Sequence, residues 1–148
     1  MEAIDFFIEN KTLFLIFHML SVVVGMGSAI IADILFNFYS KDKIINNTER
    51  RSLELLSKTI WISLIVIILS GGAIFFSAPT KYMLSQKFIT KMIIVIILLL
   101  NGLFLSRFIS PHFSDRGLLK FKNKQSIRQF AFASGAISIT SWFIVFIL

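Results

Sequence analysis

The stretch that decides the fold is TLFLIFHMLSVVVGMGSAIIADILFNF, residues 12–38, which carries one acidic residue and no lysine or arginine. A helix needs about 20 apolar residues to cross about 30 Å of hydrocarbon, and this run is longer than that. Three more apolar stretches follow, at about residues 55–76, 88–109 and 127–148. We therefore predict a single transmembrane domain, residues 1–148, with the fold of an all-α integral membrane four-helix bundle.

The composition of the whole chain agrees with this fold class. Of the 148 residues, 56% are hydrophobic and 16% are charged, whereas a water-soluble domain has roughly 45–50% apolar and about 25% charged residues. The chain contains no cysteine, which excludes disulfides, iron–sulfur clusters and thiolate metal sites. Neither a glycine-rich phosphate loop nor a serine–histidine–acid set occurs in a suitable context. We therefore expect neither a hydrolase nor a nucleotide-driven protein.

Lysine and arginine are concentrated in two of the three connections between the predicted helices. Five lie between the first two helices and six in or beside the last connection: Lys41, Lys43, Arg50, Arg51 and Lys58, and Arg107, Arg116, Lys120, Lys122, Lys124 and Arg128. Because basic loops face the cytoplasm, we predict that these loops are cytoplasmic and that both termini lie outside a cell inner membrane. The net charge of +7 then needs no nucleic acid. The expected partners are the lipid bilayer and either a second copy of the chain or a membrane partner subunit.

His18 lies inside the first predicted helix. At about 100° per residue, it shares one stripe with Ser21, Gly25 and Ser28, and Asp33 lies at the edge of that stripe. Small residues at this spacing let helices approach closely, so the stripe should face the interior of the bundle. Because ionisable residues within a membrane are functional by default, we interpret His18 as a ligand or proton-handling residue. A structural histidine, hydrogen-bonded to a neighbouring helix, is the alternative.

Each predicted helix brings one distinctive feature to the same depth, near the outer face. These features are His18, the pair Gly71 and Gly72, Lys91, and Trp142. The glycine pair would leave room for a flat or bulky group beside the histidine, and Lys91 would supply a cation. As alternatives, Lys91 extends to the headgroups and the glycines only permit helix packing.

A second polar level lies near the cytoplasmic face. Asp33 and Arg107 should lie within about 3 Å of the same depth, which predicts an ion pair that clamps the bundle. The amide of Asn101 should find a hydrogen-bond partner on another helix. His112 lies about 30 Å from His18, across most of the bilayer, so these two histidines cannot bind one haem within a single chain.

Four short motifs resemble one family of membrane proteins. They are FHMLSVVVG at residues 17–25, the basic pair Arg50 and Arg51, SGG at residues 70–72, and KFITKMIIVIILLL at residues 87–100. In this order and length they are similar to the HemJ-type protoporphyrinogen oxidases and the related CopD copper-resistance membrane domain. The resemblance implies a four-helix membrane fold that binds haem b, with functional roles for His18 and Lys91.

We therefore expect a small integral-membrane haem- or porphyrin-binding protein of redox type, in which a HemJ-like oxidoreductase activity is left open. His18 would be the metal ligand, and Lys91 would be the catalytic residue and pair with a carboxylate. The cofactor-binding residues would be His18, Gly71, Gly72, Lys91 and Trp142.

Two alternative functions stay open. One is a non-enzymatic membrane protein that handles a small solute or copper, with His18 and the thioethers of Met19, Met83 and Met92 as candidate ligands. The other is a packing subunit of a larger membrane complex, in which side chains fill the pocket.

Overall fold

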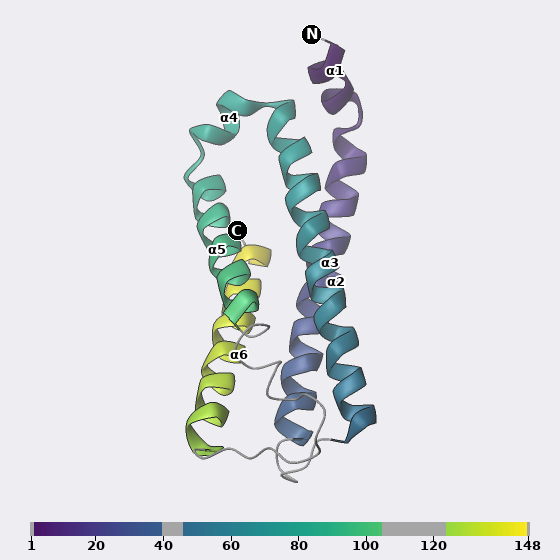
Figure 1. The fold of residues 1–148 in the computed structure, drawn as a ribbon. Helices are drawn as coiled ribbons and strands as arrows, with labels where there is room; N and C mark the ends of the chain where they lie inside the picture. Colours follow the sequence, from purple (N-terminus) through teal and green to yellow (C-terminus); the bar gives the residue numbers. More distant parts are fainter. Residues whose placement is uncertain (1, 40–45, 105–123, 148) are drawn as a thin grey trace.

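The computed structural model describes residues 2–39, 46–104 and 124–147, without the side chains of residues 2, 3 and 124–131. Within these ranges every regular element is helical, which confirms the predicted all-α class. The elements are α1 (Glu2–Glu9), α2 (Lys11–Tyr39), α3 (Asn47–Ser77), α4 (Pro79–Met83), α5 (Gln86–Phe104) and α6 (Lys124–Ile147) (Figure 1).

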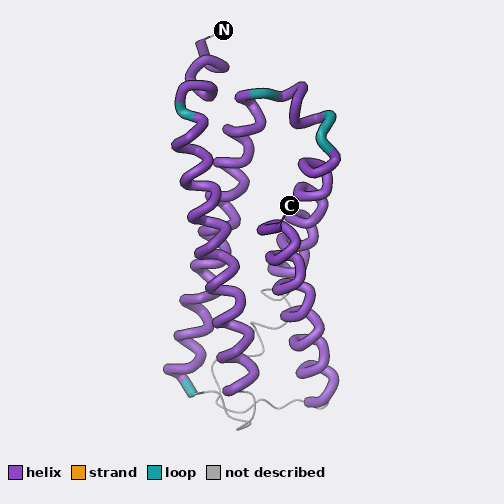
Figure 2. Tube along the Cα trace, turned by 180° about the vertical axis from the view of Figure 1, so that it is seen from behind, coloured by secondary structure: helices purple, strands orange, loops and turns teal. Residues whose placement is uncertain are grey.

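The two longest helices, α2 and α3, run antiparallel and lie side by side along most of their length (Figures 1 and 2). The short helix α4 then leads across one end of the molecule into α5, and α6 packs against both α5 and α2. We call the end of the molecule that holds α4 the α4 end, and the opposite end, where α3 and α6 begin, the far end. Since α2 and α5 both run away from the α4 end, their first turns lie at the same end of the molecule.

Three helices are long and apolar enough to cross a membrane: α2, α3 and α5. The described part of α6 adds a shorter apolar stretch, Phe132–Ile147. Large apolar side chains are exposed on all four of these helices, as expected of surfaces that face lipid. These features indicate a membrane protein, whereas the fourth span and the sidedness of the termini stay predictions.

The start of α3 differs most from the prediction. The helix begins at Asn47, and the sequence prediction placed its start at residue 55. A capping box explains the earlier start, because Asn46 Oδ1 accepts a hydrogen bond from the Asn47 amide and Glu49 Oε2 accepts one from the Asn46 amide, each at 2.8 Å. Arg50 and Glu54 then form an ion pair of 2.8 Å one turn apart. Local polar contacts therefore extend the helix beyond its apolar part.

The other boundaries lie closer to the prediction. Helix α2 spans Lys11–Tyr39 against 12–38, and α6 spans Lys124–Ile147 against 127–148. Helix α5 is described to Phe104, so the last five residues of the predicted 88–109 helix lie outside the described residues. The short helices α1 and α4 were not predicted, because neither is long enough to show an apolar period.

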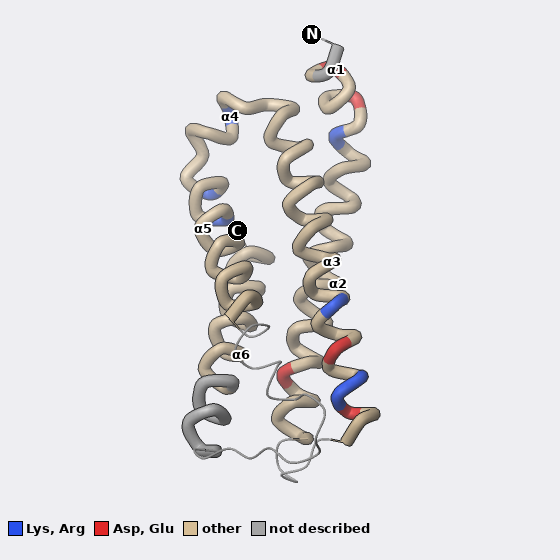
Figure 3. Tube along the Cα trace, viewed as in Figure 1, with Lys and Arg blue, Asp and Glu red and all other residues tan. Residues whose placement is uncertain are grey.

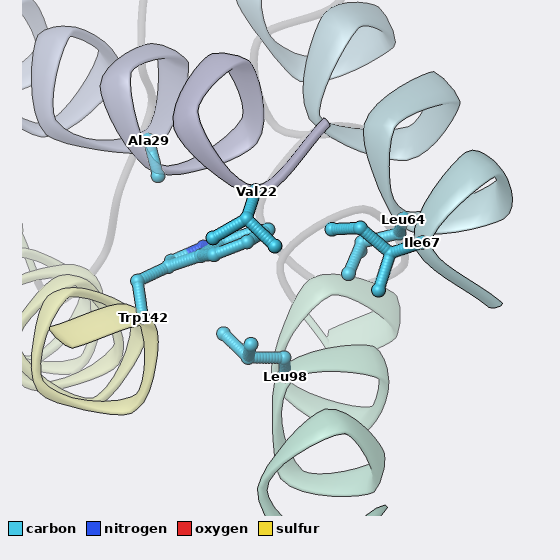
Figure 4. Close-up of a cluster of buried hydrophobic side chains, with 6 residues drawn as sticks. All are labelled: Val22, Ala29, Leu64, Ile67, Leu98 and Trp142. Carbon is cyan, nitrogen blue, oxygen red and sulfur yellow. The ribbon is translucent and has the colours of Figure 1, made fainter. Parts of the chain in front are cut away.

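The core is centred on Trp142 of α6, whose side chain is only 1% exposed. Figure 4 shows its indole among apolar side chains of α2, α3 and α5: Val22, Ala29, Leu64, Ile67 and Leu98. The ring lies against Gly25 of α2, where a Cβ atom would come within 2.6 Å of Cη2. Trp61 of α3 lies on Gly102 of α5 in a similar way, 3.5 Å from the position of a Cβ. Glycine is needed for the close approach at Gly25, whereas a Cβ at Gly102 would make an ordinary van der Waals contact with Trp61.

Candidate functional site

His18 is joined to α3 by a hydrogen bond between His18 Nδ1 and Ser70 Oγ, 3.0 Å long. The Ser70 hydroxyl also contacts the carbonyl oxygen of Val66 at 2.6 Å. A hydroxyl has one hydrogen to donate, and a carbonyl oxygen can only accept. Ser70 therefore donates to Val66 and accepts from His18, which places the imidazole proton on Nδ1. The assignment of the tautomer follows from this network.

The second nitrogen of the ring, Nε2, then carries a lone pair. Among the described residues the imidazole has a side-chain hydrogen bond to Ser70 and a backbone contact with Ile67. A neutral imidazole that is fixed through one nitrogen and has a lone pair on the other can bind a metal or accept a proton. Sequence reasoning gave Ser70 no role, although a serine one residue before the glycine pair was a visible signal.

The two glycines of the pair, Gly71 and Gly72, have different surroundings. A Cβ at Gly71 would lie 3.4 Å from His18 Cε1 and 3.7 Å from Nδ1, so this glycine borders the imidazole. A Cβ at Gly72 would meet no described atom within 4 Å. The structure therefore brings Gly71 to His18, whereas Gly72 faces open space in the described structure.

Lys91 of α5 lies close enough to His18 to act on the imidazole electrostatically. Its side chain is partly exposed, and it has no ion-pair partner among the described residues. The structure therefore brings Gly71 of α3 into contact with His18 of α2, and it places Lys91 of α5 within range of a long-range electrostatic interaction with the imidazole. This cation is available to a ligand that carries a carboxylate or another anionic group.

Trp142 occupies a different place. Its ring lies on Gly25, seven residues or about 10 Å further along α2 than His18. The sequence estimate counted back from the end of the chain and assumed that the last helix reaches the α4 end. Figure 1 shows the C-terminus partway along α2 and α3, so α6 ends before that level. The structure therefore places Trp142 in the core and does not bring it to His18.

An aromatic cluster covers the α4 end next to this site. It consists of Phe6, Phe7, Phe14, Phe75, Phe76, Tyr82 and Phe88. Phe75 and Phe88 stack across α3 and α5 with centroids 5.3 Å apart, and Phe7 stacks on Phe76 at 5.9 Å.

Three of these rings stand one helical turn from the residues of the site. Phe14 precedes His18, Phe75 follows Gly71, and Phe88 precedes Lys91. These aromatic rings therefore lie on the α4 side of the residues of the site. Sequence reasoning missed this cluster, although the adjacent pairs of phenylalanines in the chain could have indicated it.

A second cluster of polar residues connects α2, α5 and α6, nearer to the far end. Asn101 Nδ2 donates to the Ser134 carbonyl at 3.0 Å, and Ser134 Oγ donates to Asn101 Oδ1 at 2.6 Å, which confirms the predicted interhelical partner of Asn101. The next residue, Gly135, packs on Asp33 of α2 so closely that a Cβ would lie 2.9 Å from Oδ1.

Arg107, the predicted partner of Asp33, lies outside the described residues, as does His112. The ion pair between Asp33 and Arg107 therefore stays a prediction.

The part of the chain that the structure describes holds no group of three or more histidine, cysteine, aspartate or glutamate side chains that could bind a metal ion. The methionines that the sequence associates with copper, Met19, Met83 and Met92, are all exposed. The chain matches no protein-family model, no curated protein and no solved structure.

Proposed function

We propose that this chain is a small integral-membrane protein of redox type that binds haem or a related porphyrin, with His18 as an axial ligand of the iron. The hydrogen bond from His18 to Ser70 carries the proposal, because it holds the proton on Nδ1 and leaves the lone pair of Nε2 to bind the iron. Histidines that bind metals almost always donate their other N–H to an oxygen acceptor in this way.

The residues around His18 fit a haem of the non-covalent b type. Haem iron accepts a single histidine ligand, and the chain contains no cysteine for covalent attachment. Lys91 would pair with a propionate, and the aromatic cluster would keep water from the α4 side of the ring. A bound haem would supply one-electron chemistry at its iron, as the resemblance to the HemJ-type oxidases implies. Copper handling has less support, because Met19, Met83 and Met92 are exposed.

The proposed setting is a cell inner membrane, with four spans and both termini outside. The far end then lies in the cytoplasm, together with the basic residues that set the orientation, of which Arg50, Arg51 and Lys58 belong to α3. Among the described residues, the charges of α3 gather at this end (Figure 3). The His18 site accordingly lies toward the outer face, within reach of a porphyrin that enters from the lipid.

An absorption titration of the purified protein with haem b tests the proposal. We expect a Soret band distinct from that of free haem, reached at one haem per chain. Lys91→Ala should keep the band but weaken the affinity, because an unpaired propionate loses a charge-assisted contact in a poorly screened site. Lys87→Ala removes an exposed lysine one turn earlier on the same helix and should bind as the unchanged protein does. A protein supplied with ample haem that shows no Soret shift contradicts the proposal.

A further inference from the structure

Asp33 is the one acidic residue of α2, and it lies six residues before the end of the helix at Tyr39. Its Oδ2 atom is buried and has no hydrogen-bond partner in the described structure. Among the described residues, it is the buried side-chain oxygen or nitrogen atom for which no hydrogen-bond partner is found. A buried carboxylate oxygen without a hydrogen-bond partner lowers the stability of the fold. An aspartate at this position therefore needs a physical explanation.

The packing around Asp33 fixes the position of the carboxyl group. Gly135 of α6 lies directly on it, since a Cβ there would come within 2.9 Å of Oδ1 and 3.0 Å of Cγ. The preceding residue, Ser134, is held to Asn101 of α5 by two hydrogen bonds. The carboxyl group of Asp33 therefore lies where α2 packs against α6, next to the hydrogen bonds that join α6 to α5.

No described positive charge neutralises this carboxyl group. The basic groups of α2, Lys11 and His18, are at least 15 residues away, or about 22 Å along the helix, and the phenol of Tyr39 lies at the end of the helix. The charged residues of α3 at the far end are Glu49, Arg50, Arg51, Glu54 and Lys58, and the ion pair found among them joins Arg50 to Glu54. The side chains of Lys124 and Arg128 on α6, and of Arg107 and Arg116, lie outside the described residues.

Charge neutralisation by a metal cation has little support from the neighbouring atoms. Hard cations take about six oxygen ligands, whereas the nearby Asn101 Oδ1 and the Ser134 carbonyl accept hydrogen bonds from each other's residue. A proton needs only one carboxylate oxygen. Carboxyl groups inside membrane spans are found in ion pathways and proton relays.

We propose that Asp33 is a proton-binding site within the membrane span, which takes up and releases a proton from the far end of the molecule. Asp33 is only half-buried, and the end of its helix is about 9 Å away, so protons reach it from that side. The site is independent of any haem at His18, because the two residues lie at different depths of α2.

Infrared difference spectroscopy of the full-length protein in lipid tests this proposal through the carbonyl stretch of a protonated carboxylic acid. We expect a band that appears as the pH falls, shifts in D2O and has the same position in NaCl and KCl. Asp33→Asn should remove it, whereas Asp5→Asn, which changes an exposed aspartate of α1, should leave it in place. Absence of a pH-dependent band, or a band that moves with Na⁺, would overturn the proposal.

Two further variants keep the test decisive even if Asp33→Asn does not fold. Gly135→Ala places a methyl group against the carboxyl group, so the band of the folded protein should shift. Gly27→Ala, where a Cβ meets nothing within 4 Å, should not shift it. An arginine partner would hold Asp33 ionised, and a band that appears only in Arg107→Gln would therefore contradict the proposal.

Discussion

The indole of Trp142 lies so close to Gly25 that a Cβ atom at that position would come within 2.6 Å of Cη2. The same Cβ would lie 3.0 Å from Cβ of Ser63 on α3. The contact joins α6 to α2 at the centre of the core, where the tryptophan side chain is 1% exposed. The separation of these helices is therefore set by a glycine backbone and one large ring.

Gly25→Ala should lower the thermal stability of the purified protein. The ring is enclosed by other core side chains and cannot move away, and overpacking of this kind costs about 1–3 kcal/mol. Gly27→Ala, two residues away with no atom within 4 Å of the new Cβ, should leave the stability unchanged or slightly higher, because alanine favours the helix. Equal melting temperatures for the two variants would show that α6 does not pack on Gly25.

The hydrogen bonds between Asn101 and Ser134 should be visible in a double-mutant cycle. Interhelical hydrogen bonds in membranes contribute about 0.6 kcal/mol on average and up to about 1.7 kcal/mol. Asn101→Ala and Ser134→Ala should each destabilise the protein, and the double variant should lose less than the sum. Thr140→Ala should be additive with Asn101→Ala, because the hydrogen bonds found for the Thr140 hydroxyl within the described residues go to carbonyls of its own helix. Additivity in both cycles would contradict the contact between α5 and α6.

The long helices could be predicted from the sequence because their evidence is local. An apolar run such as residues 12–38 must satisfy its backbone groups within itself in a membrane, so helix is the outcome. The early start of α3 at Asn47 depends on the cap formed by Asn46 and Glu49. That signal lies in a polar segment, which a search for apolar runs passes over.

The sequence predicts the level of each candidate site residue along its helix, and this level is the part of the site that could be predicted. Counting residues from the α4 end brings His18, Gly71 and Lys91 to one level, and in the structure Gly71 contacts His18 while Lys91 lies within electrostatic range of the imidazole. Counting from the C-terminus misplaced Trp142, because the height at which α6 ends depends on the path of the chain after α5. The contact of Gly135 with Asp33 was not predictable either, since it requires the rotation of α6 about its own axis.

Cysteine labelling should establish the sidedness that the charges predict. The natural chain has no cysteine, so a single introduced thiol gives a clean signal. Thr80→Cys, at an exposed position of α4, should react with an impermeant reagent added outside the cell. Lys43→Cys, between α2 and α3 in the sequence and outside the described residues, should react only after the membrane is opened. The reverse pattern would invert the orientation and place the His18 site toward the cytoplasm.

Ser70→Ala should weaken haem binding about 10–100-fold, which is the typical effect of removing the hydrogen-bond partner of a metal-binding histidine. Without the hydroxyl acceptor, the proton of the imidazole is no longer held on Nδ1. Ser77→Ala is the matched control, because Ser77 also donates to a carbonyl of its own helix, that of Ile74 at 2.7 Å, and has no hydrogen bond to His18. The affinities come from Soret titrations, and equal affinities would remove Ser70 from the site.

Replacement of the ligand itself tests the central claim, that His18 Nε2 binds haem iron, most directly. His18→Gly removes the imidazole and leaves space for a small molecule beside Gly71, and free imidazole can then occupy that space. We predict that the folded variant loses the Soret band of the wild-type complex and regains it when imidazole is added. A His18→Gly protein that binds haem with unchanged spectrum and affinity, in the absence of imidazole, would contradict the claim.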